Sequence, residues 1–331
     1  MECKNIMVTG GMGFIGSNFI RYLKNSGFNN RLINVDALKL GSNIMNLRDI
    51  KMDDYKFIKQ DLSSNRISLE DVDCIFNFAS ETHVDRSIAD PEPFVRNNIW
   101  LIFNLLESIR HSEKNIRLIH ASTDEIYGDI ASGSFTESSP PRPSNPYSAT
   151  KVAQEALIMS YVRTYGIDAV IARSSNNFGP YQFPEKLIPK TIIRAMKGLK
   201  VPIYGNGKQR RSWIHVEDNV RAITLIAEKG IKGEVYNVPG FDEISNLDIV
   251  MQILNLMGKD ESLIEFVEDR PGHDVRYSIS GDKLKALGFK HTISLKEGLK
   301  MTIDWYTSNR TWWERLIEAD PSIISERPWK L

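Results

Sequence analysis

Cysteine is scarce in this chain, where only Cys3 and Cys74 occur among 331 residues. Two cysteines so far apart in sequence argue against a disulfide framework and against a cysteine-rich zinc site, so we expect a reducing compartment. The chain also lacks the run of about 18 apolar residues that a membrane-spanning helix needs. Its first residues show neither a long apolar stretch nor a small-residue cleavage site. We therefore expect a soluble, unprocessed, cytoplasmic protein that binds no membrane.

An excess of charge of either sign is missing as well, because 42 basic and 42 acidic residues give a formal net charge of +0. The chain has no overall attraction for nucleic acid or for an acidic surface, and we expect neither as a partner. With 41% apolar and 25% charged residues, the composition is that of an ordinary globular protein. A length of 331 residues suggests roughly two domains at about 150 residues each.

Short apolar runs alternate with longer amphipathic stretches in the first half of the chain. We expect helices over residues 14–25, 94–110 and 147–165, and strands over residues 5–9, 32–36, 56–60, 74–78, 117–121 and 169–173. This alternation is typical of an α/β fold in which a parallel sheet carries helices on both faces. The order of the elements predicts a Rossmann-like, doubly wound parallel sheet.

The sequence changes character beyond about residue 175, where short motifs rich in proline and glycine alternate with helical stretches. Phe178-Gly179-Pro180-Tyr181 and Tyr204-Gly205-Asn206-Gly207 are examples. We therefore expect a Rossmann domain over residues 1–175 that carries the cofactor and the catalytic residues. A smaller, mainly substrate-binding domain is expected over residues 176–331, with some of its segments returning to the sheet.

The first expected strand ends in a glycine-rich turn, Gly10-Gly11-Met12-Gly13-Phe14-Ile15-Gly16, and a helix follows at once. Gly10 permits a tight turn, Gly13 lets the backbone approach a pyrophosphate at the positive end of the helix, and Gly16 lets that helix pack closely on the strand. A glycine-rich turn without a ligand is the alternative. The strand before the turn and an acidic residue after it favour a dinucleotide.

That acidic residue is Asp36, at the end of the second expected strand, where a carboxylate can accept hydrogen bonds from the adenosine ribose. A 2′-phosphate would meet like charge there, so NAD is favoured over NADP, although the neighbouring Lys39 leaves NADP open. Asp61 and Leu62 follow the third strand, where an adenine amino group could be bound. An acidic helix cap fits the spacing of Asp61 nearly as well.

Tyr147 and Lys151 are four residues apart and therefore share one face of the expected helix. The lysine charge is expected to lower the pKa of the phenol, which then acts as a base on a substrate hydroxyl while hydride leaves the same carbon. The Ser122-Thr123 pair ends the fifth strand, and Asp124 and Glu125 follow it directly. Ligands of doubly wound sheets bind at this edge, so the acidic pair is expected in the active site and not in an exposed loop.

Together these residues resemble the nucleotide-sugar branch of the extended short-chain dehydrogenase/reductase family, over nearly the whole chain. More narrowly, the run Ser122-Thr123-Asp124-Glu125-Ile126-Tyr127-Gly128-Asp129 is similar to that of dTDP-glucose 4,6-dehydratases. Further similar stretches, in the same order, begin at Glu81, Ser175, Phe183 and Asp269. The resemblance implies a lyase of deoxysugar biosynthesis that uses NAD, and a homodimer formed through the helices that follow the fourth and fifth strands.

The implied reaction converts dTDP-glucose to dTDP-4-keto-6-deoxyglucose. Thr123 holds the C4 hydroxyl and Tyr147, supported by Lys151, removes its proton during oxidation. The resulting ketone makes the C5 hydrogen acidic, so that Glu125 abstracts it while protonated Asp124 gives a proton to the departing C6 hydroxyl. Hydride then returns to C6, and NAD is regenerated within one turnover.

The resemblance also implies the residues around both ligands. The cofactor site comprises Gly10, Gly13, Phe14, Ile15, Gly16, Asp36, Lys39, Asp61, Leu62, Ala79, Asn97, Tyr147, Lys151 and Asn177. The substrate site comprises His83, Thr123, Asn176, Lys186, Leu187, Pro202, Tyr204, Arg211, Asn237, Arg270 and His273. No residue is assigned to a metal. A structural role is the alternative for His83, and the cations are expected to bind the two phosphates.

Three positions depart from the pattern of the bacterial dTDP-glucose enzymes, namely Ser80, Asn97 and Ser212. A serine at position 212 is also found in UDP-glucose 4,6-dehydratases, so UDP-glucose remains an alternative substrate. A nucleotide-sugar 4-epimerase needs no acidic pair, and a UDP-glucuronate decarboxylase would have its carboxylate repelled by one. The alternative outside enzymes is a non-catalytic NAD-binding scaffold on the same fold.

Overall fold

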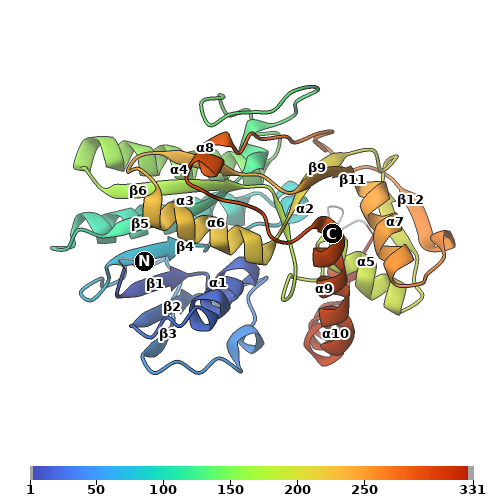
Figure 1. Ribbon diagram of the computed structural model, residues 1–331, viewed down its shortest axis with the longest axis horizontal. Coiled ribbons are helices and arrows are strands. Elements are labelled where there is room, and N and C mark those ends of the chain that lie inside the picture. Colours follow the sequence, from blue (N-terminus) through green and yellow to red (C-terminus); the bar gives the residue numbers. More distant parts are fainter. Residues whose placement is uncertain (1–2, 327–331) are drawn as a thin grey trace.

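A seven-stranded parallel sheet forms one lobe of the molecule in a computed structural model that describes residues 3–326 (Figure 1). The strand order is β10-β6-β5-β4-β1-β2-β3. The strands are β1 (Ile6–Thr9), β2 (Leu32–Asp36), β3 (Tyr55–Lys59), β4 (Cys74–Asn77), β5 (Arg117–Thr123), β6 (Asp168–Ser174) and β10 (Val235–Val238). The Rossmann-like α/β fold expected from the sequence is confirmed.

Helices cover both faces of this sheet, which explains why β1, β2 and β4 are buried along their whole length. On one face, α1 (Phe14–Asn25) and α6 (Val216–Lys229) bury their apolar stripes in one core cluster. On the other face, α3 (Glu92–Arg110) and α4 (Pro146–Tyr165) bury theirs in a second. The three expected helices lie within two residues of α1, α3 and α4. The edge strand β3 is only partly buried.

The second lobe contains two small sheets and a separate apolar core (Figure 1). Its strands are β7 (Asn176–Phe178), β8 (Val201–Tyr204), β9 (Arg210–His215), β11 (Asp242–Ser245) and β12 (Ile264–Val267). Its helices are α5 (Leu187–Met196), α7 (Asn246–Leu256), α9 (Leu295–Ser308) and α10 (Arg310–Ala319). Between β9 and β11 the chain returns to the large sheet, where β10 pairs in parallel with β6.

The remaining elements are short. They are α2 (Val84–Ala89), α8 (Asp282–Ala286) and the 3-10 turns η1 (Ile44–Leu47), η2 (Asp124–Tyr127), η3 (Glu261–Leu263) and η4 (Pro321–Ile324). Within residues 3–326, no helix is both long enough and apolar enough to cross a membrane.

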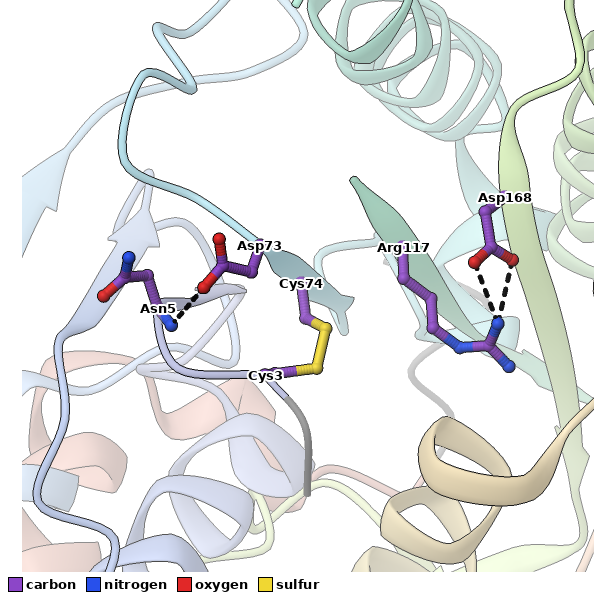
Figure 2. The surroundings of a disulfide bond; sticks show 6 residues. All are labelled: Cys3, Asn5, Asp73, Cys74, Arg117 and Asp168. Carbon is purple, nitrogen blue, oxygen red and sulfur yellow. Dashed lines mark hydrogen bonds and ion pairs between the residues drawn. A yellow bond between two sulfur atoms is a disulfide. The ribbon is translucent and has the colours of Figure 1, made fainter. Parts of the chain in front are cut away.

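A disulfide joins Cys3 to Cys74, contrary to the expectation that the two cysteines stay apart (Figure 2). They are 71 residues apart in sequence, but β1 pairs with β4 and places Ile6 opposite Cys74. Asn5 donates its backbone N–H to the Asp73 carboxylate at 2.8 Å and holds the same two segments together. Sequence distance failed as a guide here because parallel pairing brings the start of β1 beside the start of a strand much later in the chain.

Candidate active site

The glycine-rich turn after β1 forms a cradle at the start of α1. Gly10 has a φ of 72°, and a Cβ there would lie 2.6 Å from the backbone nitrogen of Ala79. A Cβ on Gly16 would lie 2.3 Å from the carbonyl oxygen of Gly10. At Gly13, by contrast, a Cβ would meet only that carbonyl, at 3.3 Å, and no side chain caps the helix there. The turn therefore leaves backbone N–H groups open to a pyrophosphate, which fits NAD.

Asp36 ties the end of β2 to this turn. Its carboxylate accepts hydrogen bonds from the backbone N–H of Met12 at 2.9 Å, from that of Leu38 at 2.7 Å and from the hydroxyl of Ser42 at 2.9 Å. Lys39 forms an ion pair with Asp61 at 2.8 Å. Because this pair neutralises the cation that had left NADP open, the arrangement fits a ribose without a 2′-phosphate.

The other expected cofactor residues surround the same region. Leu62 is buried, and Ala79 lies against the glycine turn. Asn97 donates to the side chain of Glu81 at 3.1 Å, and its Oδ1 lies 3.4 Å from the hydroxyl of Ser63. Neither Asp36 nor Asn97 lines the cavity described next.

A cavity of about 340 Å³ lies where the strands of the large sheet end and the second lobe begins. It brings together residues from both lobes that the sequence had nominated. Those that line it are Gly10, Phe14, Ile15, Gly16, Thr123, Asp124, Glu125, Tyr147, Asn176, Asn177, Lys186, Leu187, Pro202, Tyr204, Arg211, Arg270 and His273. This grouping joins the cofactor turn, the acidic pair and the cations in one site.

The acidic pair owes its position to the end of β5. Thr123 ends the strand and caps η2, since its hydroxyl accepts a hydrogen bond from the backbone N–H of Glu125 at 3.2 Å. Asp124 is 2% exposed. Burial, and next the charge of Glu125, raise its pKa to about 7. Burial raises the pKa of Glu125 as well, but the cations Arg270, Lys186 and Arg211 oppose that rise.

Tyr147 follows Asn145 and Pro146, which start α4 with a capping box and a proline in the first turn. The expectation that Lys151 lowers its pKa is not met in the protein alone. Burial and the charges of Glu125 and Asp124 raise the pKa of the phenol, and a hydrogen bond from Thr123 opposes them. Lys151 lies behind the cavity wall, where Nζ donates to the carbonyl of Ala121 at 2.8 Å. Burial lowers its pKa to about 7.

Cations and aromatic rings also line the cavity. The guanidinium of Arg211 lies 4.2 Å from the ring centroid of Tyr277 and donates to the carbonyl of Asp274 at 2.8 Å. Arg270 pairs with the carboxylate of Asp85. Positive charge held in this way suits a diphosphate.

Two nominated substrate residues do not reach the cavity. His83 is 3% exposed and lies against the carboxylate of Glu185, behind the lining. Asn237 is 0% exposed and does not line the cavity. Its side chain accepts a hydrogen bond from the hydroxyl of Tyr127 at 2.9 Å. Its place on β10, beside β6, turns the side chain toward the core. Both residues have partners that fit a structural role.

The structure adds lining residues that the sequence reasoning missed, namely Asp85, Ser175, Lys190, Asn246 and Tyr277. Asn246 is the first residue of α7, directly after its cap Ser245. The sequence shows the capping serine that begins this helix. It does not show that the first residue of the helix lines the cavity, because this depends on how the second lobe packs. Lys190 has its pKa lowered to about 8 by burial.

Several polar atoms around the cavity are buried without a partner. Among residues 3–326, Asp124 Oδ2, Glu125 Oε2, Asn176 Oδ1, Asn177 Oδ1 and Arg270 Nε find no hydrogen bond. Unpaired buried polar atoms cost free energy, so their presence on residues that line one cavity indicates a polar ligand.

Comparison with known proteins agrees with this site. Residues 7–302 match the model of a family described as GDP-mannose 4,6 dehydratase. A dTDP-glucose 4,6-dehydratase of Streptomyces niveus is 42% identical over 325 residues, which cover 95% of this chain and 96% of the relative. The crystal structure of the dTDP-glucose 4,6-dehydratase DesIV from Streptomyces venezuelae with NAD bound is 39% identical, covers 94% of this chain and 99% of its own, and has a TM-score of 0.90. The UDP-glucose 4-epimerase of Thermus thermophilus, with NAD, is 27% identical at a TM-score of 0.83 and covers 92% of this chain and 99% of its own.

Proposed function

This chain belongs to the GDP-mannose 4,6 dehydratase family, and from that premise and its cavity we propose that it is an NAD-dependent hydro-lyase that converts dTDP-glucose to dTDP-4-keto-6-deoxyglucose. The observation that carries this function is the acidic pair at the end of β5, the buried Asp124 and the partly buried Glu125, in one cavity with Thr123 and Tyr147. A 4-epimerase changes one carbon and has no use for two carboxyl groups next to the phenol. Dehydration needs both, because one must give a proton and the other must take one.

Oxidation at C4 is the first step. Thr123 holds the C4 hydroxyl and Tyr147 takes its proton, with the ammonium of Lys151 in support. Bound NAD supplies the hydride acceptor for C4 and, later, the hydride donor for C6. The glycine turn Gly10–Gly16, Asp36 and the Lys39–Asp61 pair are the residues that would hold it.

Elimination follows from the charges of the acidic pair. With the ketone at C4, the C5 hydrogen becomes acidic and Glu125 removes it. Asp124, whose pKa is about 7, holds its own proton near neutral pH and gives it to the departing C6 hydroxyl. Glu125 keeps its charge more easily because Arg270, Lys186 and Arg211 favour the carboxylate. Different surroundings thus divide two adjacent carboxyl groups into an acid and a base.

The cations of the cavity are proposed to take the nucleotide. Arg211, Arg270 and Lys186 face the diphosphate, with His273 and Asn176 beside them. Ser212, which had raised UDP-glucose as an alternative, lies on β9 outside the lining. Its side chain therefore does not favour uracil over thymine by direct contact, and dTDP-glucose is the substrate proposed here.

We further propose that the protein is a cytoplasmic homodimer. The helices α3 and α4 pack side by side on one face of the sheet, and α3 leaves Val95 and Trp100 each 54% exposed. Large exposed apolar side chains on α3, which packs beside α4, suit a two-fold contact in which four helices pack together.

Mass spectrometry of the protein mixed separately with dTDP-glucose and UDP-glucose tests this function. We expect the loss of one water from dTDP-glucose at a higher rate than from UDP-glucose. An Asp124→Asn/Glu125→Gln variant that still binds NAD is the matched control and should release no water. A hexose that changes to its C4 epimer at unchanged mass would replace the dehydratase with an epimerase. A product from UDP-glucose alone would overturn the nucleotide assignment.

A further inference from the structure

A row of polar side chains crosses the apolar interior of the large sheet and ends at Lys151. Thr9 of β1 is in register with Asn77 of β4, and Asn77 is in register with His120 of β5. Side chains in register on parallel strands point to the same face. All three are buried, at 0%, 1% and 0% exposure, respectively.

Hydrogen bonds run along this row from end to end. The hydroxyl of Thr9 donates to Oδ1 of Asn77 at 2.5 Å, and Nδ2 of Asn77 lies 2.9 Å from Nδ1 of His120. The other ring nitrogen, Nε2, lies 3.4 Å from Nζ of Lys151. Both nitrogens of His120 are therefore engaged, one by the row and one by the lysine.

The row does not contribute to the backbone ladder of the sheet, because its bonds join side chains only. Apolar residues at these positions would fill the same space without the cost of burying polar groups. What the polar row provides and apolar residues would not is a ring nitrogen directed at the lysine. Lys151 is itself 3% exposed, and the other acceptor that its Nζ contacts is the uncharged backbone carbonyl of Ala121, at 2.8 Å.

We propose that His120 is a positioning residue, which accepts a hydrogen bond from Lys151 and so keeps that side chain charged and in place beside Tyr147 while C4 is oxidised. The proposal rests on the function proposed above. His120 acts without touching substrate, through Lys151 alone. A neutral imidazole suits this role because it offers an acceptor without adding a second positive charge.

The charge of His120 agrees with this geometry. Burial, and next the charge of Lys151, hold the pKa of the imidazole well below its ordinary value, so the ring is neutral. With Nε2 accepting from Lys151, Nδ1 carries the proton and donates to the oxygen of Asn77 once that amide rotates by half a turn. Thr9 serves either orientation, since a hydroxyl both donates and accepts.

Other titratable groups face Lys151 and set the background against which His120 acts. Its own helix contributes Tyr147 and Glu155, and Glu155 acts to raise the pKa of Lys151. That carboxylate is in turn paired with Arg173 of β6 at 2.6 Å. From β4 comes only the neutral amide of Asn77, by way of His120. Burial lowers the pKa of Lys151, and the imidazole opposes this effect in our proposal. Removing the imidazole should therefore lower that pKa further and shift Lys151 toward its neutral form.

The test uses the NAD-loaded enzyme and dTDP-6-deoxyglucose, which has a C4 hydroxyl to oxidise but no C6 hydroxyl to lose. The absorbance of NADH then follows the first step alone, at a series of pH values. His120→Met removes the ring nitrogens at similar volume, whereas His120→Gln returns an amide oxygen near the position of Nε2. We expect the alkaline limb of the rate to move to lower pH by about one unit in His120→Met, a tenfold loss of rate on that limb. His120→Gln should lie close to the wild type, with KM unchanged in both.

Coincident pH profiles for wild type and His120→Met would overturn the proposal, as would an equal shift in His120→Gln. A purely structural histidine would lower stability in both variants without moving the pH limb. If His120→Met does not fold, Asn77→Leu, which removes the partner that orients the ring, should move the limb in the same direction, and an unmoved limb there refutes the role. Failure of the proposed function is recognised separately, because the wild type would then release no water from dTDP-glucose and form no NADH.

Discussion

At the residue scale, the proposed chemistry depends on two adjacent carboxyl groups, and the structure gives them different surroundings. Asp124 is 2% exposed and next to like charge, which favours its neutral form. Three cations, Arg270, Lys186 and Arg211, act on Glu125 and oppose the rise of its pKa. One therefore keeps a proton near neutral pH, while the other is helped to lose it.

The role of Glu125 leads to a prediction about exchange with solvent. A base that takes the C5 hydrogen and returns it should incorporate deuterium at C5 of the product when the reaction runs in heavy water. Glu125→Gln should slow this incorporation by about 10²-fold or more, as for loss of a general base, with NAD binding intact. Mass spectrometry of the product measures it. Glu137→Gln, which changes a carboxyl group outside the cavity lining, is the control. Exchange at the wild-type rate in Glu125→Gln would exclude this residue as the base.

The raised pKa of Asp124 makes stability depend on pH. The carboxyl titrates at 3.8 in its ordinary state and at about 7 in the folded protein. The folded state therefore holds a proton that the unfolded state releases between these values, and stability falls as the pH rises through that window. Asparagine cannot ionise, so Asp124→Asn should gain stability over the wild type on going from pH 5 to pH 8, by roughly 3 kcal/mol, since about two pH units of the window lie in this interval at about 1.4 kcal/mol per unit.

Denaturant unfolding at the two pH values measures that gain. Asp49→Asn is the control, because the pKa of Asp49 is lowered by its bond to Arg21 and the group stays charged throughout this range. The difference in the free energy of unfolding between Asp49→Asn and the wild type should be the same at pH 5 and pH 8. A gain in Asp124→Asn that is the same at pH 5 and pH 8 would show that the carboxyl is not neutral in the folded protein.

Residues with a local signature were the ones that the sequence could nominate. Gly10, Gly13 and Gly16 follow a strand at a characteristic spacing, and the runs around Asp124 and Tyr147 resemble a known family. His83 and Asn237 were nominated by resemblance alone, and their side chains find partners elsewhere. Which way a side chain points depends on packing between distant segments, and a single sequence does not contain that information directly.

At the scale of elements, hydrophobic periodicity was a good guide to the large sheet and its helices. The strand β2 and the helix α1 coincide with the expected ranges. The strand β5 runs two residues further than expected, to Thr123, so that the threonine proposed to hold the C4 hydroxyl belongs to the strand itself. The short strands of the second lobe were not assigned, since their three to six residues leave too little periodicity to detect.

Pairing of β1 with β4 also brought Cys3 and Cys74 together, and this element contact yields a prediction. A bond that closes a loop between residues 71 apart should stabilise the fold by about 4 kcal/mol through the entropy of the unfolded chain. Cys3→Ser and Cys74→Ser should each lower the free energy of unfolding by up to this amount. The double variant should lose no more than either single one.

Intact mass after alkylation of the protein taken directly from cells tells whether the bond is present there. A protein without added alkyl groups would show that the disulfide is present in cells, although cytosolic proteins rarely keep disulfides. Two added alkyl groups would mean that both cysteines are free thiols in cells. The wild type and the variants should then have equal free energies of unfolding under reducing conditions. Activity should persist in both variants, because Cys3 and Cys74 lie outside the cavity lining.

The whole molecule brings cofactor, acidic pair and cations together only because two lobes close on one cavity. The large sheet supplies the ends of β1 and β5, and the second lobe supplies Arg211, Arg270 and Asn246. The return of β10 to the large sheet fixes one lobe against the other. The change in the sequence beyond about residue 175 predicts two domains, but the position of β10, the strand that returns to the large sheet, could not be predicted from a run of four residues.

At the largest scale, the surface of α3 supports the proposed homodimer. Trp100 and Val95 are each 54% exposed, and Trp100 touches the ring of Phe103 at a centroid distance of 5.5 Å. Trp100→Glu puts a charge in the centre of the expected contact, where no partner would neutralise it, and should convert a dimer to a monomer. Sedimentation or light scattering at a series of concentrations measures the change. Phe266→Glu is the matched control, since Phe266 is 57% exposed on β12 in the other lobe and should leave the dimer intact. A wild type that stays monomeric at all concentrations, or a Phe266→Glu variant that dissociates as readily as Trp100→Glu, would contradict a contact through α3 and α4.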